Sequence, residues 1–255
     1  MAFVLKNNGF SVFHSTKQDG NMGYDFGKVD DVNNNRIKFL NKNDISGNIH
    51  EIQNCHSPNI ALIGENNEIV KFKTQPLFDS NNEKLINGTD GLFSFDDVAI
   101  CGITGDCIPL TIWEPESHLH GMIHIGLIGS LNDILNSFVK LVENYNFNIH
   151  STHAYLGPAI TVKNYNISKS GVWKNVGNEA LEKIKNIDNF IELRENQMYF
   201  NTKKMVINRL ISIGLPMQNI FNFDYCTAEP DSLFFSHYYS INNNLPNARF
   251  LTVIK

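Results

Sequence analysis

The chain has 255 residues and a formal net charge of -5, and 42% of its residues are hydrophobic, 18% charged and 11% aromatic. This composition is typical of a globular protein, and it excludes a strongly basic surface for nucleic acid. No run of about 18 apolar residues occurs, so no membrane span and no membrane partner are expected. The first residues lack the pattern of a signal peptide. We therefore expect a cytoplasmic protein with four reduced cysteines.

The N-terminal half is predicted to be a series of short strands. Segments rich in aromatic and β-branched residues alternate there with Asn, Asp and Gly, which is typical of strands joined by turns. These segments are 9–15, 48–55, 59–64, 68–74 and 91–95. Runs of three asparagines at 33–35 and 242–244 are predicted to be loops.

Three further strands are predicted at 97–104, 109–115 and 121–129, where the residues are apolar with little alternation. Continuous apolar runs indicate strands that are covered on both faces. Such strands belong at the centre of a layered structure rather than on its surface.

Three helices are predicted in the C-terminal half. The first begins after Ser130, a typical N-cap residue, and runs to Tyr145 with apolar residues at helical spacing. The other two cover about 178–190 and 201–216, and the last is ended by a glycine and a proline.

The tail, residues 231–255, is predicted to form two strands joined by a polar loop. Strands followed by mixed strands and helices indicate a layered α/β architecture. No repeat and no linker of Pro, Gly or Ser divides the chain, so we expect a single domain over 1–255.

Cys107 and His124 are the candidates for chemistry in the central strands. Cys107 follows Asp106 at the end of the first apolar strand, and sites in α/β sheets gather at strand ends. His124 lies in the third apolar strand, and Gly126 and Gly129 follow it at the start of a helix, where backbone N–H groups bind anions. A buried thiol and a hydrogen-bonded core histidine are the alternative interpretations.

His56 adds a third candidate ligand, because it lies between two predicted strands. One thiolate and two imidazoles suit Zn or Cu, and three protein ligands leave one coordination position for water or substrate. Cys107 with His124 also suffices for metal-free nucleophilic chemistry. His118 and His120 lie in a predicted hairpin loop, where we expect them to be exposed.

Several segments occur in the order and at the spacing of one known family. They are FHSTKQDGN, DDVNNNR, NCHSPNIALI, TDGLFSF, ITGDCIPLTIWEPE, GMIHIGLIGS, AYLGPAITVKNYNI, CTAEPDSLFFS and NARFLTVI. Together they resemble the multicopper-oxidase-like laccase-domain family, whose members are also called purine nucleoside phosphorylase or peptidoglycan editing factor. The resemblance implies a single layered α/β/β/α domain with mixed sheets, of the cysteine-hydrolase-like kind.

The resemblance assigns the family's metal-binding and catalytic residues to His56, Cys107 and His124. It implies phosphorolysis of adenosine, inosine or methylthioadenosine, or deamination of adenosine, with Zn at the site and Cu as the alternative metal. We expect Asp106 to take part in catalysis by orienting a metal-bound histidine. The implied partners are a purine nucleoside and phosphate, and the protein would be a monomer or a homodimer.

Eight residues are predicted to bind substrate, because they lie in the matching motifs or beside the trio. They are Lys17, Asn35, Arg36, Gly126, Gly129, Tyr165, Phe235 and Ser236. Tyr165 and Phe235 would stack on the purine base, with packing in the core as the alternative role for both.

The chain departs from the family pattern at several polar positions. Lys17, Asp25, Asn54, Leu127, Ile128, Asn201, His237 and Tyr238 replace Arg, Asn, Gln, Trp, Arg, Asp, Arg and Arg. Replacement of Arg by Ile128 removes a bidentate donor for an anion, and the neighbouring sequence offers no substitute. Two alternatives therefore stand beside the enzyme: a metal-free Cys–His amide hydrolase that edits peptidoglycan precursors, and a purine-binding paralogue without turnover.

Overall fold

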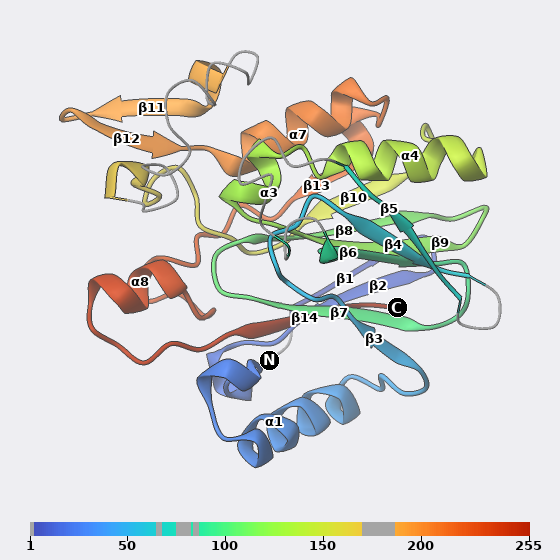
Figure 1. Cartoon of the computed structure of the whole chain (residues 1–255). Helices are drawn as coiled ribbons and strands as arrows, with labels where there is room; N and C mark the ends of the chain where they lie inside the picture. Colours follow the sequence, from blue (N-terminus) through green and yellow to red (C-terminus); the bar gives the residue numbers. More distant parts are fainter. Residues whose placement is uncertain (1–2, 65–67, 75–82, 84–86, 170–186) are drawn as a thin grey trace.

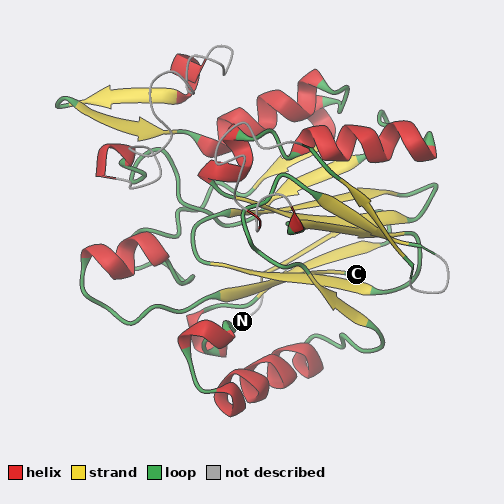
Figure 2. Ribbon diagram, in the orientation of Figure 1, coloured by secondary structure: helices red, strands yellow, loops and turns green. Residues whose placement is uncertain are grey.

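Two mixed β-sheets pack face to face in the computed structural model, and helices cover the outer face of each sheet (Figure 1). The structure describes residues 3–64, 68–74, 83, 87–169 and 187–255. This layered, mixed α/β fold is the one that the sequence predicted. Figure 2 shows the helices above and below the paired sheets. No helix in the described ranges is long and apolar enough to cross a bilayer.

The first sheet has five strands and contains both ends of the described chain. In spatial order they are β1 (Phe3–Asn7), β2 (Phe10–His14), β14 (Phe250–Ile254), β7 (Ala99–Thr104) and β3 (Ile49–Glu51). Only the β3–β7 pair is parallel. A two-residue turn of Asn8 and Gly9, both with positive φ, joins β1 to β2, as is typical of a tight hairpin.

The second sheet has seven strands. In spatial order they are β13 (Ile220–Asn222), β10 (His153–Leu156), β8 (Ile108–Glu114), β9 (Leu119–Ile125), β6 (Gly91–Ser94), β4 (Ile60–Ile63) and β5 (Ile69–Phe72). Every residue of β8 and β9 is buried. This confirms the prediction that the continuous apolar runs are covered on both faces.

Helices cover the two outer faces. Within the described ranges, the α-helices are α1 (Val29–Lys42), α3 (Leu127–Leu131), α4 (Leu135–Tyr145), α7 (Thr202–Ser212) and α8 (His237–Asn242). A separate hairpin consists of β11 (Ile191–Arg194) and β12 (Gln197–Phe200). The 3₁₀ helices of the same ranges are Lys17–Asp19, Tyr24–Phe26, Ile167–Lys169, Ile187–Phe190 and Met217–Asn219. α1 buries Phe39 on the five-stranded sheet, and α4 buries Phe138 on the seven-stranded sheet.

Alternation along β9 decides which of its side chains face the helices. Ile123 and Ile125 pack in the core cluster that contains Phe138 of α4. Met122 packs instead with Ile100 of β7, between the two sheets. Because side chains alternate along a strand, His124 lies on the same inner face as Met122.

A buried histidine, His14, forms hydrogen bonds with side chains of both sheets. His14 on β2 is 1% exposed, and its Nδ1 lies 2.8 Å from Oγ1 of Thr252 on β14. Its Nε2 lies 3.1 Å from the hydroxyl of Tyr155 on β10, in the other sheet. Burial and the nearby positive charge of Lys203 lower the pKa of His14 to about 3, so its imidazole is neutral.

The prediction that a helix begins after Ser130 was wrong. The chain turns helical at Leu127, with Gly126 as the N-cap, so the third apolar strand ends at Ile125 rather than at 129. Asp133 has a positive φ of 50° and separates α3 from α4. Its side chain accepts a hydrogen bond from Arg209 Nε at 2.9 Å, which fixes the break against α7.

Two other local predictions were wrong. The asparagines at 33–35 belong to α1, because the helix buries Val32 and Phe39, and tertiary packing outweighs the weak helix propensity of Asn. In the tail, only Phe250–Ile254 is a strand. The other predicted strand contains α8, whose N-cap Ser236 accepts a hydrogen bond from the backbone N–H of Tyr239.

The remaining helix and loop predictions had mixed outcomes. The helix predicted at 201–216 is α7, which ends at Ser212. The helix predicted at 178–190 lies largely outside the described residues, and its end is a 3₁₀ helix. His118 is exposed as expected, but His120 is buried on β9, with Nε2 2.8 Å from the carbonyl oxygen of Val98.

Titration of His14 is expected to lower the free energy of unfolding at mildly acidic pH. The unfolded histidine binds a proton near pH 6.5 and the folded one only near pH 3, so the unfolded chain holds more protons between these values. The free energy of unfolding should therefore fall with pH below 6.5, by up to about 1.4 kcal/mol per unit from this residue.

Denaturant unfolding at pH 7.5, 6.5 and 5.5 measures this effect. The variant His14→Gln should be less stable at pH 7.5 but should lose that part of the pH slope. The matched control is His150→Gln, because His150 is exposed. An unchanged slope in His14→Gln would contradict the proposed titration.

Candidate metal centre

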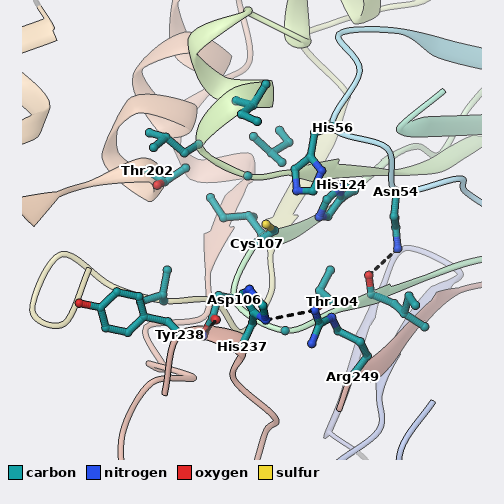
Figure 3. Close-up of a pocket in the computed structure, with 18 of the residues that line it drawn as sticks. Asn54, His56, Thr104, Asp106, Cys107, His124, Thr202, His237, Tyr238 and Arg249 are labelled. Atoms are coloured by element: carbon teal, nitrogen blue, oxygen red, sulfur yellow. Dashed lines mark hydrogen bonds between the residues drawn. The ribbon is translucent and has the colours of Figure 1, made fainter. Parts of the chain in front are cut away.

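His56, Cys107 and His124 converge on one point (Figure 3). Their ligand atoms, one sulfur and two ring nitrogens, all lie within 4.8 Å of one another. The centroids of the two imidazole rings are 5.0 Å apart. The structure thus brings together the three side chains that the sequence singled out from distant segments.

The pairing of β8 with β9 places Cys107 beside His124. In this antiparallel ladder Pro109 lies opposite His124 and Ile108 opposite Ile125. Cys107 precedes β8 directly, so it lies at the end of the sheet where β9 ends. The sequence GDC before a proline gave this position correctly as a strand end.

Gly126 makes room for the thiol. A Cβ atom at Gly126 would lie 2.7 Å from Sγ of Cys107 and 3.3 Å from Cδ2 of His56. Real Cβ atoms do not approach other heavy atoms to 2.7 Å, so any larger residue would push the thiol out of place. Gly129 has no such role, because its nearest neighbour would lie 3.8 Å away.

Asp90 is the carboxylate that orients the histidines. Its side chain is fully buried and accepts a hydrogen bond from Nδ1 of His124 at 2.8 Å. It also accepts bonds from the backbone N–H groups of Cys55, His56 and Ser57, at 3.2, 2.9 and 2.6 Å. Because Nδ1 of His124 is committed to this carboxylate, Nε2 is left to face the cysteine or a metal.

The same carboxylate holds a left-handed turn. The backbone of His56 has a φ of 62°, a value that residues other than glycine rarely adopt. Hydrogen bonds from three successive backbone N–H groups to Asp90 compensate this conformation. Burial alone would raise the pKa of Asp90, but the bonds from His124, Cys55 and His56 lower it to about 2.

Cys107 and His124 form a charged pair. Burial alone would raise the pKa of Cys107, but attraction to His124 and hydrogen bonds from His124 and His56 lower it to about 5. Burial alone would lower the pKa of His124, but the negative charges of Cys107 and Asp90 outweigh it and raise this pKa above the usual range. At neutral pH the thiol is therefore a thiolate, the form that binds metals and attacks electrophiles.

Asp106 does not orient a metal-site histidine, contrary to the prediction. Its carboxylate accepts hydrogen bonds from the hydroxyls of Thr227 and Ser236 and from the backbone N–H of Tyr238, each at 2.6 Å. These contacts fix the start of α8 against the loop that carries Cys107. Burial, only partly offset by these bonds, raises the pKa of Asp106 to about 7.

The trio lines a cavity of about 630 Å³, a volume that suits a small molecule. Its lining is part apolar and part polar. The apolar lining residues include Leu127, Ile128, Ile160, Tyr165 and Ile241. The polar lining residues include Asp25, Asn54, Thr104, Asp106, His237 and Arg249.

Only two of the eight residues predicted to bind substrate line this cavity, namely Gly126 and Tyr165. The six that are absent from its lining are Lys17, Asn35, Arg36, Gly129, Phe235 and Ser236. Arg36 instead forms a bidentate ion pair with Glu51, at 2.8 and 2.9 Å. Asn35 donates to the carbonyl of Asn21, and Ser236 holds Asp106.

Asp90 and Arg249 lie at this centre, although neither is among the residues that the sequence predicted for it. Both lie in segments that carried the family resemblance, TDGLFSF and NARFLTVI, which was the available signal. The residues next to Ile128 in the sequence offer no substitute for the arginine of the family pattern, but the residues that share its cavity include an arginine. Arg249 lies 121 positions from Ile128 in the chain and lines the same cavity.

Comparison with known proteins gives family matches over the chain. The family model described as multi-copper polyphenol oxidoreductase laccase matches residues 1–254. A purine nucleoside phosphorylase of Staphylococcus saprophyticus is 26% identical over 176 residues, 67% of this chain and 63% of the relative. One from Staphylococcus aureus is 27% identical over 154 residues, 60% of this chain and 55% of the relative. The chain thus matches less than two thirds of the length of these curated relatives.

Solved structures share the fold. The hypothetical protein YfiH of Bacillus licheniformis is 21% identical, with a TM-score of 0.79 over 99% of this chain and 95% of that one. YlmD from Geobacillus stearothermophilus is also 21% identical, with a TM-score of 0.74 over 96% of this chain and 91% of that one.

The thiolate of Cys107 is expected to react selectively in metal-free protein. Iodoacetamide at pH 6 should label Cys107 first, because its thiol is already ionised. His124→Gln removes the stabilising cation and should slow this labelling by at least about tenfold. Peptide mass spectrometry after chelator treatment measures the rates.

Cys101 is the internal control for labelling. It is buried, and desolvation raises its pKa to about 12, so it should stay unlabelled until the protein unfolds. Equal labelling of Cys107 at pH 6 in wild type and His124→Gln would contradict the ionised pair.

Gly126→Ala is expected to weaken Zn binding by at least about tenfold, because the added methyl group displaces the thiol from the histidines. Competition with a chromophoric chelator measures the affinity. Gly129→Ala, in the same short helix, has room for the methyl group and should bind Zn as the wild type does. Equal affinities in all three proteins would contradict the expected displacement of the Cys107 thiol.

Proposed function

We propose that this chain, which belongs to the multi-copper polyphenol oxidoreductase laccase family, is a metal-dependent purine nucleoside phosphorylase. The observation that carries the proposal is the convergence of His56, Cys107 and His124 at a cavity of about 630 Å³. The staphylococcal relatives, which are purine nucleoside phosphorylases by name, support the reaction class. Adenosine, inosine and methylthioadenosine are the substrates that we propose.

The donor set fits a Zn ion, with Cu as the alternative metal. A thiolate and two imidazoles are ligands that both metals accept, and the low pKa of Cys107 keeps the sulfur deprotonated. Asp90 fixes the ring of His124 with Nε2 available, as a partner of a metal-bound histidine does. When bound, the ion would supply a positive charge that polarises an oxygen of a substrate.

The residues of the chain position the reactants. In phosphorolysis an oxygen of hydrogen phosphate bonds to C1′ of the nucleoside, while the C1′–N9 bond breaks. The purine leaves with the electron pair and takes up the proton that the phosphate loses. The apolar lining residues Leu127, Ile128 and Ile160 offer contact area for the base. Tyr165 adds an aromatic ring to the lining.

Adenosine deamination is a second reaction that we propose for the same centre, since both reactions use a purine nucleoside in this cavity. The two reactions have different products. Phosphorolysis requires phosphate and yields ribose 1-phosphate and the free base. Deamination releases ammonia and converts adenosine into inosine, whose C1′–N9 bond stays intact.

A metal-free cysteine hydrolase is the second candidate function. It is supported by the hydrogen bonds from His124 and His56 to the thiol and by the bond from His124 to Asp90. This chain of cysteine, histidine and carboxylate is the arrangement of an activated nucleophile. A purine-binding paralogue without turnover would instead bind nucleoside tightly and form no product.

Cys107→Ala is expected to abolish turnover of adenosine, by at least about a hundredfold, because it removes both a metal ligand and the thiolate. Chromatography of products from adenosine with and without phosphate measures both reactions. Cys226→Ala is the matched control, because Cys226 is a free thiol that is absent from the cavity lining.

Elemental analysis of the purified protein decides between the two candidates. Near-stoichiometric Zn or Cu, lost in Cys107→Ala and retained in Cys226→Ala, supports the phosphorylase. Activity that survives in Cys107→Ala would exclude both mechanisms. Full activity in metal-free protein would exclude the metal-dependent one.

A further inference from the structure

Arg249 lies at the cavity that contains the candidate metal centre. It directly precedes β14, and it is the only lysine or arginine among the described residues of the cavity lining. Figure 3 shows its guanidinium beside His237, joined by a hydrogen bond. The other cation of the lining, the charged imidazole of His124, is already paired with Asp90 and Cys107, so Arg249 is the natural partner of an added anion in this cavity.

The guanidinium lies in a slot that the fold builds for it. Its Cζ is 4.0 Å from the centroid of the Phe26 ring, which is a cation–π contact. A Cβ at Gly23 would lie 3.0 Å from Cγ of Arg249, and one at Gly105 would lie 3.1 Å from its Cδ. The side chain therefore passes between two glycines and rests on an aromatic ring, which restricts its direction.

The charge of Arg249 has no acidic partner within 4.0 Å in the described part of the chain. The other three arginines of the sequence, Arg36, Arg194 and Arg209, each form an ion pair. Arg249 donates only to the carbonyl of Ala248 at 2.9 Å and to Nδ1 of His237 at 3.4 Å.

A guanidinium carries five N–H donors and stays charged at any physiological pH. Partial burial of this charge without an acidic partner is unfavourable. Burial accordingly lowers the pKa of Arg249, although the charges of Asp106, Cys107 and Asp25 oppose this effect. A ligand that brings negative charge would remove the penalty.

We propose that Arg249 binds inorganic phosphate as the second substrate, a contact that the side chain of Ile128 cannot make. This inference rests on the proposed phosphorolysis. Phosphate matches the fork of a guanidinium with two parallel hydrogen bonds, which a ribose hydroxyl or a purine nitrogen does not. The isoleucines of the lining, Ile128, Ile160 and Ile241, offer no side-chain donor, so we assign the phosphate to Arg249.

Arg249 transfers no proton in this scheme. It holds the oxyanion while an oxygen of hydrogen phosphate bonds to C1′, the C1′–N9 bond breaks, and the purine leaves with the electron pair and takes up the proton that the phosphate loses. His237 and Phe26 act as positioning residues, because they contact the guanidinium and fix its direction.

Kinetics at saturating nucleoside test the assignment. Arg249→Gln should raise the KM for phosphate by about 10- to 100-fold and leave the KM for nucleoside within about twofold, because it removes a charge-assisted bidentate contact. Arg249→Lys should raise it less, since lysine keeps the charge but not the fork. Arg194→Gln removes an exposed, ion-paired arginine outside the cavity and should behave as wild type.

A binding measurement separates this inference from the proposed function. Inorganic phosphate should raise the Tm of the wild type and of Arg194→Gln, relative to chloride at equal ionic strength, and should not raise that of Arg249→Gln. This result without any turnover would support the anion site while the proposed phosphorolysis fails. The same phosphate shift in Arg249→Gln and wild type, or no shift in wild type, would overturn the inference.

A 5′-phosphate of a nucleotide is the other source of the same chemistry. If adenosine monophosphate gives an Arg249-dependent shift and inorganic phosphate gives none, the assignment to the second substrate is wrong. Should Arg249→Gln fail to fold, phenylglyoxal modification of the wild type replaces it. Phosphate should then protect Arg249 and not Arg194, and equal protection of both would overturn the inference.

Discussion

The buried carboxylate of Asp90 is the contact on which the candidate centre depends. It accepts hydrogen bonds from Nδ1 of His124 and from the backbone of residues 55–57, so it ties the loop of His56 to strand β9. A fully buried charge is unfavourable unless hydrogen bonds satisfy it, and here one imidazole and three amides do so. The same bonds keep His56 in a left-handed conformation and leave Nε2 of His124 free. One side chain therefore sets the positions of two candidate ligands.

The two-sheet packing supplies the third candidate ligand and the space around it. Cys107 lies next to His124 because β8 and β9 are paired, and both strands are buried between the helices and the five-stranded sheet. Gly126 then ends β9 without a side chain, and the thiol occupies the volume that a Cβ would take. Asp106, adjacent to Cys107, holds α8 instead of a histidine, so two neighbouring residues serve different parts of the site. Layer packing and local sequence thus act on the centre together.

The cavity keeps one arginine although the family pattern has others that this chain lacks. Leu127 and Ile128 give apolar lining where the pattern has Trp and Arg, while Arg249 comes from the C-terminal segment that resembles the family. Its side chain is held by Phe26 and by the room at Gly23 and Gly105, which are distant from it in the sequence. The replaced residues taken alone suggest a cavity without an arginine. The fold provides a single, directed guanidinium among the described lining residues.

The sequence by itself determined the layered α/β class, the buried central strands and helix α7, and its resemblance to the family singled out His56, Cys107 and His124, which the structure brings together. Apolar runs, cap residues and strand ends are local properties, and they can be read without coordinates. Only the tertiary structure decided that Asp90 rather than Asp106 orients His124, that His120 is buried, that Ser236 begins a helix, and that Arg249 enters the cavity. Each of these depends on groups far apart in the chain, for example 34 positions between Asp90 and His124. Local propensity carries no information about such contacts, because packing between the layers creates them.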